Sequence, residues 1–169
     1  LFLEKALKSR ISYLVAQKYG VYTNPLDLRC LEENDYLYKK NYSTSSGKRT
    51  NVLRSLKERI SKDTKSPIIQ HYLNDKNHIP PWILTTSIPY GLTIEWYNIL
   101  NSDDKQDICN SFIAPGLLTP EQSKEFVRKS LELTKEYRNK IAHGNRTFSM
   151  ISLPQLPKVQ TLSLTFNVI

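Results

Sequence analysis

Residues 119–144 read TPEQSKEFVRKSLELTKEYRNKIAHG, and this stretch decides the fold class. Thr119 is a typical N-cap, Pro120 suits the first helical position, and Gln122 completes a capping box with Thr119. No helix-breaking residue follows before Gly144, a residue type that often comes directly after a helix. We therefore predict one helix of about 24 residues, roughly 36 Å long at a rise of 1.5 Å per residue.

The chain before this helix shows apolar residues at three- and four-residue spacing, which is typical of amphipathic helices. Further helices are predicted over residues 2–18, 51–61, 68–73, 82–100 and 103–113, the fourth divided at Pro89. Thr50, Ser66 and Ser102 are their predicted caps. We expect an all-α bundle forming one domain over residues 1–150, followed by an extended tail over residues 151–169 that includes a strand candidate at 161–169.

Composition excludes several classes of protein. With 169 residues, of which 39% are hydrophobic, the chain is long enough to bury a core and too apolar for a disordered tail. No run of about 18 apolar residues occurs, so no contact with a membrane interior is expected. Two cysteines, Cys30 and Cys109, are too few for a disulfide framework, and we expect buried thiols in a cytoplasmic protein.

The net charge of +8 points to a polyanionic partner, and it is concentrated in one segment. Residues 39–65 hold nine basic and two acidic residues, a net charge of +7. Two interpretations stay open: a solvated helix face, or a surface that contacts phosphates. The second singles out the cations Lys48, Arg49, Arg54 and Lys57, with Tyr36, Tyr38 and Tyr42 as candidates for base stacking.

The end of the long predicted helix carries the candidate chemistry. On a helical wheel Arg138 falls inside the apolar arc, between Val127 and Leu131. Because a lone buried charge is costly, an arginine there must be paired or must face a pocket or a partner. Asn139 lies between Arg138 and His143 on the wheel, so the three side chains are expected to project into one groove.

These residues resemble a known signature. The pattern Arg138-Asn139-x-x-Ala142-His143-x-x-Arg146 is similar to that of HEPN ribonucleases, and in particular of the Abi-like family of abortive-infection proteins. A second block, Ile79-Pro80-Pro81-Trp82-Ile83-Leu84 followed by Tyr90-Gly91-Leu92, is similar to that family's Pro-x-Trp and aromatic-Gly segments. The resemblance covers residues 3–150 and departs at Gly144, where the family usually has a second histidine.

The resemblance implies a HEPN-like bundle that cleaves RNA without a metal or other cofactor, in phage defence, at a site shared by two protomers. Arg138, Asn139 and His143 are the implied catalytic residues, with Arg146 as a further RNA contact. A neutral imidazole can accept the proton of an RNA 2′-hydroxyl, and a guanidinium can hold the scissile phosphate. One histidine cannot be base and acid at once, so we expect a homodimer, with an RNA or protein antitoxin as a further partner.

Two other functions stay open at the level of sequence. The first is a non-catalytic RNA-binding module on the same fold, regulated by a bound small RNA. The second is an interaction scaffold that dimerises through its apolar helix ends and tail. A metal enzyme is not expected, since no cluster of His, Asp and Glu has the spacing of metal ligands.

Overall fold

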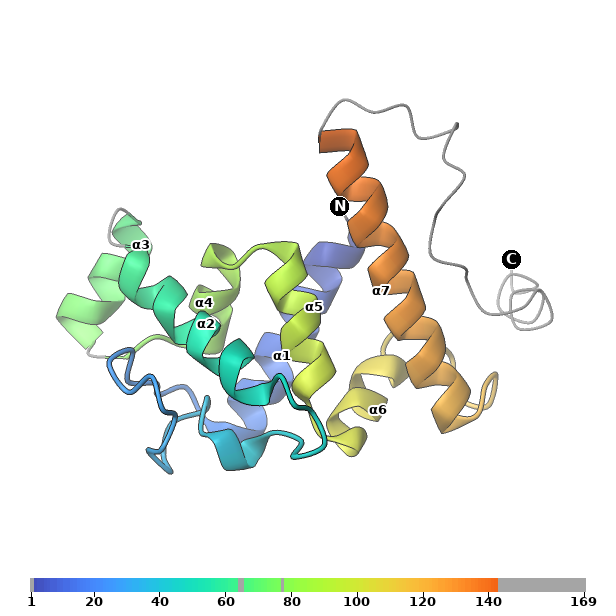
Figure 1. Ribbon diagram of the computed structural model, residues 1–169, viewed down its shortest axis with the longest axis horizontal. Helices are drawn as coiled ribbons and strands as arrows, with labels where there is room; N and C mark the ends of the chain where they lie inside the picture. Colours follow the sequence, from blue (N-terminus) through green and yellow to red (C-terminus); the bar gives the residue numbers. More distant parts are fainter. Residues whose placement is uncertain (1, 64–65, 77, 143–169) are drawn as a thin grey trace. The chain divides into compact units, whose positions relative to one another are not determined.

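The computed structural model describes residues 2–63, 66–76 and 78–142, and these residues contain helices and no strand (Figure 1). The elements in chain order are α1 (Phe2–Tyr19), the short 3₁₀ helix η1 (Lys39–Asn41), α2 (Arg49–Lys62), α3 (Pro67–His71), the π-helical turn η2 (Tyr72–Lys76), α4 (Pro81–Ser87), α5 (Tyr90–Ile99), α6 (Ser102–Asn110) and α7 (Pro120–Ala142). The prediction of an all-α fold is confirmed.

The chain divides into two compact units, residues 1–104 and residues 105–169, and each is described by itself. In the first unit, α1 packs against α4 and α5, and α2 packs against the same two helices. Figure 1 shows these four helices side by side. The single domain expected over residues 1–150 stays a prediction, and the expected tail over 151–169 lies outside the described residues.

The core of the first unit is built from the predicted apolar stripes. In α1 the buried side chains include Leu7, Ile11 and Val15, and in α2 they are the stripe Val52, Leu53, Leu56 and Ile60, with Lys57 among them. Aromatic residues fill the centre. The Trp96 indole N–H donates to the Tyr42 hydroxyl at 3.1 Å, and that hydroxyl donates to the Tyr36 carbonyl at 3.0 Å.

Local signals set most helix ends. Gly20, at a φ of +82° that L residues rarely adopt, ends α1 as predicted. The Ser66 hydroxyl accepts the Ile69 N–H and caps α3, and the break at Pro89 separates α4 from α5. The predicted cap at Thr50 is wrong, because α2 already begins at Arg49. Ser102 likewise is the first residue of α6 rather than the residue before it.

A buried ion pair fixes the long segment between α1 and α2. The Lys57 ammonium, on α2, lies 2.5 Å from a carboxylate oxygen of Asp35, and both side chains are 0% exposed. Asp35 is also bonded to the backbone of its own segment: its carboxylate accepts the N–H groups of Asn24 at 3.0 Å and Leu37 at 2.7 Å. A segment with little regular structure is thereby tied to the helical core at one residue.

The second unit contains the predicted long helix. Thr119 and Gln122 form the reciprocal capping box: the Gln122 N–H donates to the Thr119 hydroxyl at 3.3 Å, and the Thr119 N–H donates to the Gln122 amide oxygen at 3.0 Å. Pro120 is the first helical residue, and the helix runs to Ala142, the last described residue. The capping prediction is therefore confirmed.

Candidate functional site

Arg138 and Asn139 lie in the last described turns of α7, where the sequence places them. The buried residues of α7 are Ser123, Val127 and Leu131, all in its first half. Arg138 follows Leu131 by seven residues and Val127 by eleven, so at about 100° per residue it lies within about 20° of both on the helical wheel. The structure confirms the helix to which this wheel applies, and the place of Arg138 on the face of Val127 and Leu131 follows from the residue spacing.

The environment of that stripe changes along the helix. Beyond Leu131, no described residue of α7 is buried, Arg138 itself is exposed, and Ile141 is 58% exposed. The acidic partners of the helix lie earlier, in the ion pairs Arg128–Glu132 at 2.8 Å and Lys129–Glu125 at 2.7 Å. Arg138 therefore keeps an accessible guanidinium on a face whose earlier residues, Val127 and Leu131, are apolar and buried.

His143 and Arg146, the other predicted residues of this site, lie outside the described residues. The structure therefore brings Arg138 and Asn139 onto one helix end but gives no geometry for the imidazole. Asn139 is half-buried and directly follows Arg138 in the last turns. The predicted groove of three side chains stays a prediction.

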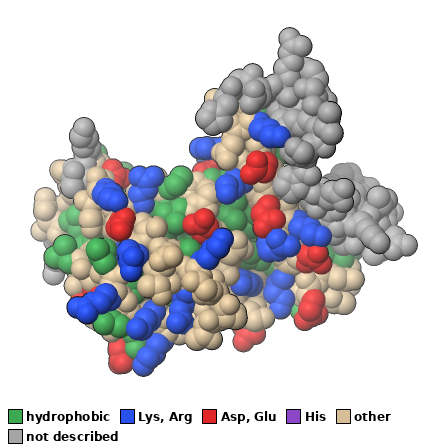
Figure 2. All heavy atoms as spheres, viewed as in Figure 1, with side chains coloured by type: hydrophobic (Ala, Val, Ile, Leu, Met, Phe, Trp, Pro, Cys, Tyr) green, Lys and Arg blue, Asp and Glu red, His purple; other side chains and the backbone are tan. Residues whose placement is uncertain are grey.

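Some of the cations in the basic segment, residues 39–65, lie at the protein surface. Lys48 and Arg54 are exposed, and Arg49 is half-buried because its guanidinium donates to the Tyr42 carbonyl at 3.1 Å. Figure 2 shows Lys and Arg side chains spread over the face on which α2 lies. These three cations can reach a polyanion, and they stay candidates for RNA binding.

Lys57 does not belong to that surface, and its predicted role as an RNA contact is wrong. Its side chain is fully buried, with Asp35 at 2.5 Å and Asp27 at 3.9 Å. An ammonium with two carboxylates beside it and no exposed surface cannot contact a phosphate without unfolding its surroundings.

The three tyrosines considered for base stacking are also core residues. Tyr36, Tyr38 and Tyr42 are 0%, 8% and 1% exposed. Tyr36 stacks on Trp96 with ring centroids 6.5 Å apart, and burial raises the pKa values of Tyr36 and Tyr42 well above the ordinary range. Their rings are therefore unavailable to a nucleobase.

The predicted burial of both cysteines is confirmed. Neither Cys30 nor Cys109 is in a disulfide, and burial raises the pKa of the Cys30 thiol to about 11. In residues 2–142, as far as the structure describes them, no group of three or more His, Cys, Asp or Glu side chains is placed to hold a metal ion. None of the described helices combines the length and apolar character needed to cross a membrane.

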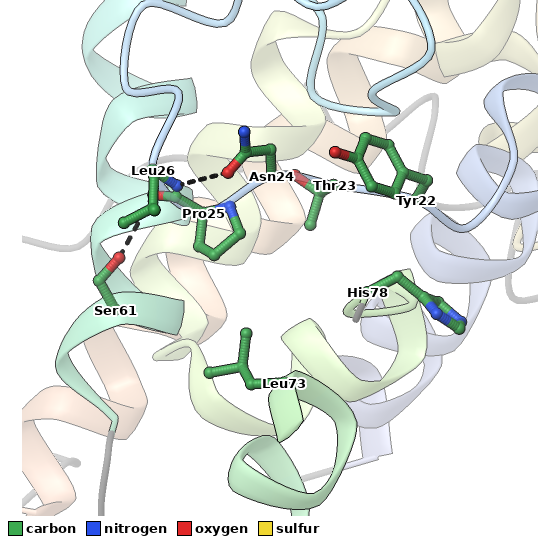
Figure 3. Close-up of a pocket in the computed structure, with 8 residues that line it drawn as sticks. All are labelled: Tyr22, Thr23, Asn24, Pro25, Leu26, Ser61, Leu73 and His78. Carbon is green, nitrogen blue, oxygen red and sulfur yellow. Dashed lines mark hydrogen bonds between the residues drawn. The ribbon is translucent and has the colours of Figure 1, made fainter. Parts of the chain in front are cut away.

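Sequence reasoning missed one feature, a hollow of about 510 Å³ in the first unit (Figure 3). Its walls come from the segment that follows α1, from the end of α2, and from η2 together with His78, which precedes α4. The lining residues are Tyr22, Thr23, Asn24, Pro25, Leu26, Ser61, Leu73 and His78. They are spread over more than fifty positions without a motif, so no short-range signal could have joined them.

Comparison with models of known protein families shows to which family the chain belongs. A family model described as Abi-like protein matches residues 2–149, which is most of the chain. The chain belongs to the Abi-like family. The match includes α1 to α7 and extends past the predicted catalytic residues, so the resemblance noted in the sequence holds at the level of the family.

Membership of the Abi-like family associates this protein with abortive infection, a form of defence against phage. No curated protein and no solved structure matches the chain. What the Abi-like protein does in molecular terms therefore has to be inferred from its own residues.

Proposed function

We propose that this Abi-like protein is a metal-independent RNA endonuclease whose active site forms between two copies of the chain. Arg138, Asn139 and His143 are the catalytic residues of the proposal. The observation that carries it is the position of Arg138, which continues the buried stripe of α7 and yet is exposed in a single chain.

A charged residue on an otherwise apolar helix face indicates a specific role for the charge. A solvent-facing arginine that only stabilised the helix end would fit any face of α7. Arg138 instead lies on the face of Val127 and Leu131, beside Ile141, whose side chain is 58% exposed. A second copy that packed on this face would bury Ile141 and bring two guanidinium groups toward one cleft.

The chemistry of these groups matches the cleavage of an RNA strand. A neutral His143 accepts the proton of a 2′-hydroxyl, and the 2′-oxygen attacks the adjacent phosphorus. The bond from phosphorus to the 5′-oxygen breaks, and that oxygen takes a proton from the protonated His143 of the second copy. The Arg138 guanidinium holds the phosphate oxygens and stabilises the charge that grows on them, while Asn139 orients the imidazole.

The exposed cations of the first unit serve to bind the strand. Lys48, Arg49 and Arg54 are proposed RNA contacts, together with Arg146 near the catalytic residues. A cation at the surface strengthens binding to any sequence and makes it depend on salt. The alternative is a non-catalytic RNA-binding module regulated by a bound small RNA, and the same cations favour it. It differs from the endonuclease in that it does not require His143.

Cleavage of RNA in the presence of EDTA tests the proposal. We expect the natural chain to cut a single-stranded RNA, and His143→Ala and Arg138→Ala to lower the rate at least about a hundredfold each, as is typical for loss of an acid–base group or a charge-stabilising group. Arg128→Ala is the matched control, because Arg128 lies on the same helix and pairs with Glu132.

The outcomes separate the two candidate functions. Equal cleavage by His143→Ala and the natural chain would refute the assigned catalytic role. RNA binding without cleavage by any variant would favour the regulated binding module. His71→Ala is the matched control for His143→Ala, since His71 is an exposed histidine of α3 in the first unit.

A further inference from the structure

The hollow in the first unit has two chemically different ends (Figure 3). Tyr22 and His78 lie at one end, and Pro25, Leu26 and Leu73 lie at the other. A volume of about 510 Å³ falls within the range of small-ligand pockets. Apolar walls with one aromatic ring and one imidazole suit a flat heterocycle better than an extended chain.

The aromatic end is held in a fixed orientation. The Tyr22 hydroxyl donates to Glu32 at 3.1 Å, and Glu32 also accepts the Asn24 amide at 2.6 Å. The His78 Nδ1 lies 2.7 Å from the Lys76 carbonyl oxygen, so Nδ1 carries a proton and Nε2 is left to bond a ligand. A ring that is already positioned loses little conformational freedom when a ligand stacks on it.

One polar group of the lining has no partner. The Thr23 hydroxyl is buried and makes no hydrogen bond in the part of the chain that the structure describes. In Figure 3 its methyl group points into the hollow while its oxygen lies toward Asn24. One staggered step about the Cα–Cβ bond would bring the hydroxyl to the place of the methyl group, which gives a ligand with an N–H or a carbonyl a partner at this wall.

Positive charge lies beside the hollow, at the same end of α2. Ser61 lines the hollow, and its neighbour Lys62 lines a second depression of about 210 Å³ together with Arg59. Arg59 is exposed, and the Lys62 side chain is 70% exposed in its pair with Glu58. At about 100° per residue, Lys62 lies next to Ser61 around α2 and Arg59 lies about 160° from it, so Lys62 is the one of these two cations that a group in the hollow can approach.

We infer that this hollow is a nucleotide subsite, which takes one unpaired base of a single-stranded RNA while Lys62 contacts an adjoining phosphate. The base stacks on Tyr22 and bonds His78, and Leu26 and Leu73 exclude water from its other edge. The inference depends on RNA as the ligand of the proposed function but not on cleavage, because no residue of the hollow belongs to the catalytic set.

Two oligonucleotides with equal numbers of phosphates test the subsite. One is a 2′-O-methyl RNA, which the proposed mechanism cannot cut because it has no free 2′-hydroxyl, and the other is its abasic counterpart. Fluorescence anisotropy of labelled strands gives both dissociation constants. The natural chain should bind the strand with bases about tenfold more tightly, the scale expected for one stacked base.

Ser61→Trp fills the hollow from an exposed position, so the fold should tolerate it. It should abolish the preference for bases and leave the affinity for the abasic strand unchanged. Tyr22→Leu should lower the preference without blocking the hollow. Ser9→Trp, an exposed serine of α1 that does not line the hollow, is the matched control and should keep the preference of the natural chain.

The result that overturns the subsite is equal affinity of the natural chain for both strands, or a preference that survives both Ser61→Trp and Tyr22→Leu. If either result is found and the natural chain still cleaves unmodified RNA, the proposed endonuclease function is unaffected. Failure to bind either strand would instead remove the subsite and the RNA-directed function together. Unchanged circular dichroism of Ser61→Trp guards against loss of structure as the cause.

Discussion

Replacing Lys57 by methionine should destabilise the first unit far more than any other lysine of α2. The Lys57 ammonium lies 2.5 Å from Asp35 and 3.9 Å from Asp27, with no exposed surface. Removing the cation leaves a buried carboxylate without its counter-charge, which costs about 3–5 kcal/mol. Methionine has nearly the length of lysine, so the loss of packing is small and the electrostatic effect dominates.

Replacing Asp35, the other member of the ion pair, should lower the free energy of unfolding even more. Asp35→Ala leaves the ammonium unpaired and also removes the acceptor of the Asn24 and Leu37 N–H groups. Each orphaned donor adds about 1–3 kcal/mol to the cost. Since a domain has about 5–15 kcal/mol of stability in total, Asp35→Ala is expected to unfold the unit at room temperature.

Urea denaturation followed by tryptophan fluorescence measures the effect, because Trp82 and Trp96 both lie in the first unit. With a urea dependence of about 2 kcal/mol per molar, Lys57→Met should lower the midpoint by about 2 M. Lys62→Met is the matched control on the same helix: its side chain is 70% exposed in an i,i+4 pair, and it should cost less than about 0.5 kcal/mol. Equal effects of the two substitutions would refute the importance assigned to the buried pair.

Three further outcomes are expected. The free energy of unfolding should fall as the pH rises from 9.0 toward about 11, since burial raises the pKa of the Cys30 thiol and the unfolded chain therefore releases that proton at a lower pH. Chemical denaturation across this range measures the fall, and a smaller fall in Cys30→Ala would identify Cys30 as the titrating group. Thr119→Ala should cost about 1 kcal/mol by removing the capping box, which thermal unfolding of α7 by circular dichroism detects; no change would mean that the cap is redundant. Ile141→Asp should convert the proposed dimer into a 19.6 kDa monomer in light scattering, with Tyr13→Asp as a control at another exposed hydrophobic position; a dimer that persists would remove Ile141 from the interface.

The helices could be predicted because their signals are local. The capping box at Thr119, the proline between α4 and α5, and the apolar spacing in α1 and α2 each involve residues a few positions apart. The π-helical turn η2 carries no such signal and was not expected. The same limit explains the cap of α2, where the backbone begins the helix at Arg49 before the better capping residue Thr50.

Burial of charged and aromatic residues could not be read from the sequence. A count of charges treats Lys57 and Lys62 alike, although their side chains are 0% and 70% exposed. The difference is Asp35, which lies twenty-two residues earlier in a segment without periodicity. Tyr36 and Tyr42 were misassigned for the same reason, because both contact Trp96, which lies far along the chain.

For the candidate site, the helical wheel assigns Arg138 to the face of Val127 and Leu131, and the helix on which that wheel depends is confirmed. The wheel could not give the exposure of Arg138, which depends on what covers the second half of α7. The nucleotide subsite was beyond sequence reasoning altogether, since its walls come from three separate segments.

The chemical identity of the RNA ends after cleavage in EDTA tests the central claim most directly. Attack by a 2′-hydroxyl, with His143 of one copy as base and His143 of the other as acid, predicts a 2′,3′-cyclic phosphate on one fragment and a free 5′-hydroxyl on the other. Mass spectrometry of the fragments distinguishes these ends from those made by water. A 3′-hydroxyl with a 5′-phosphate, or the absence of any cleavage by the natural chain, would contradict the proposed mechanism.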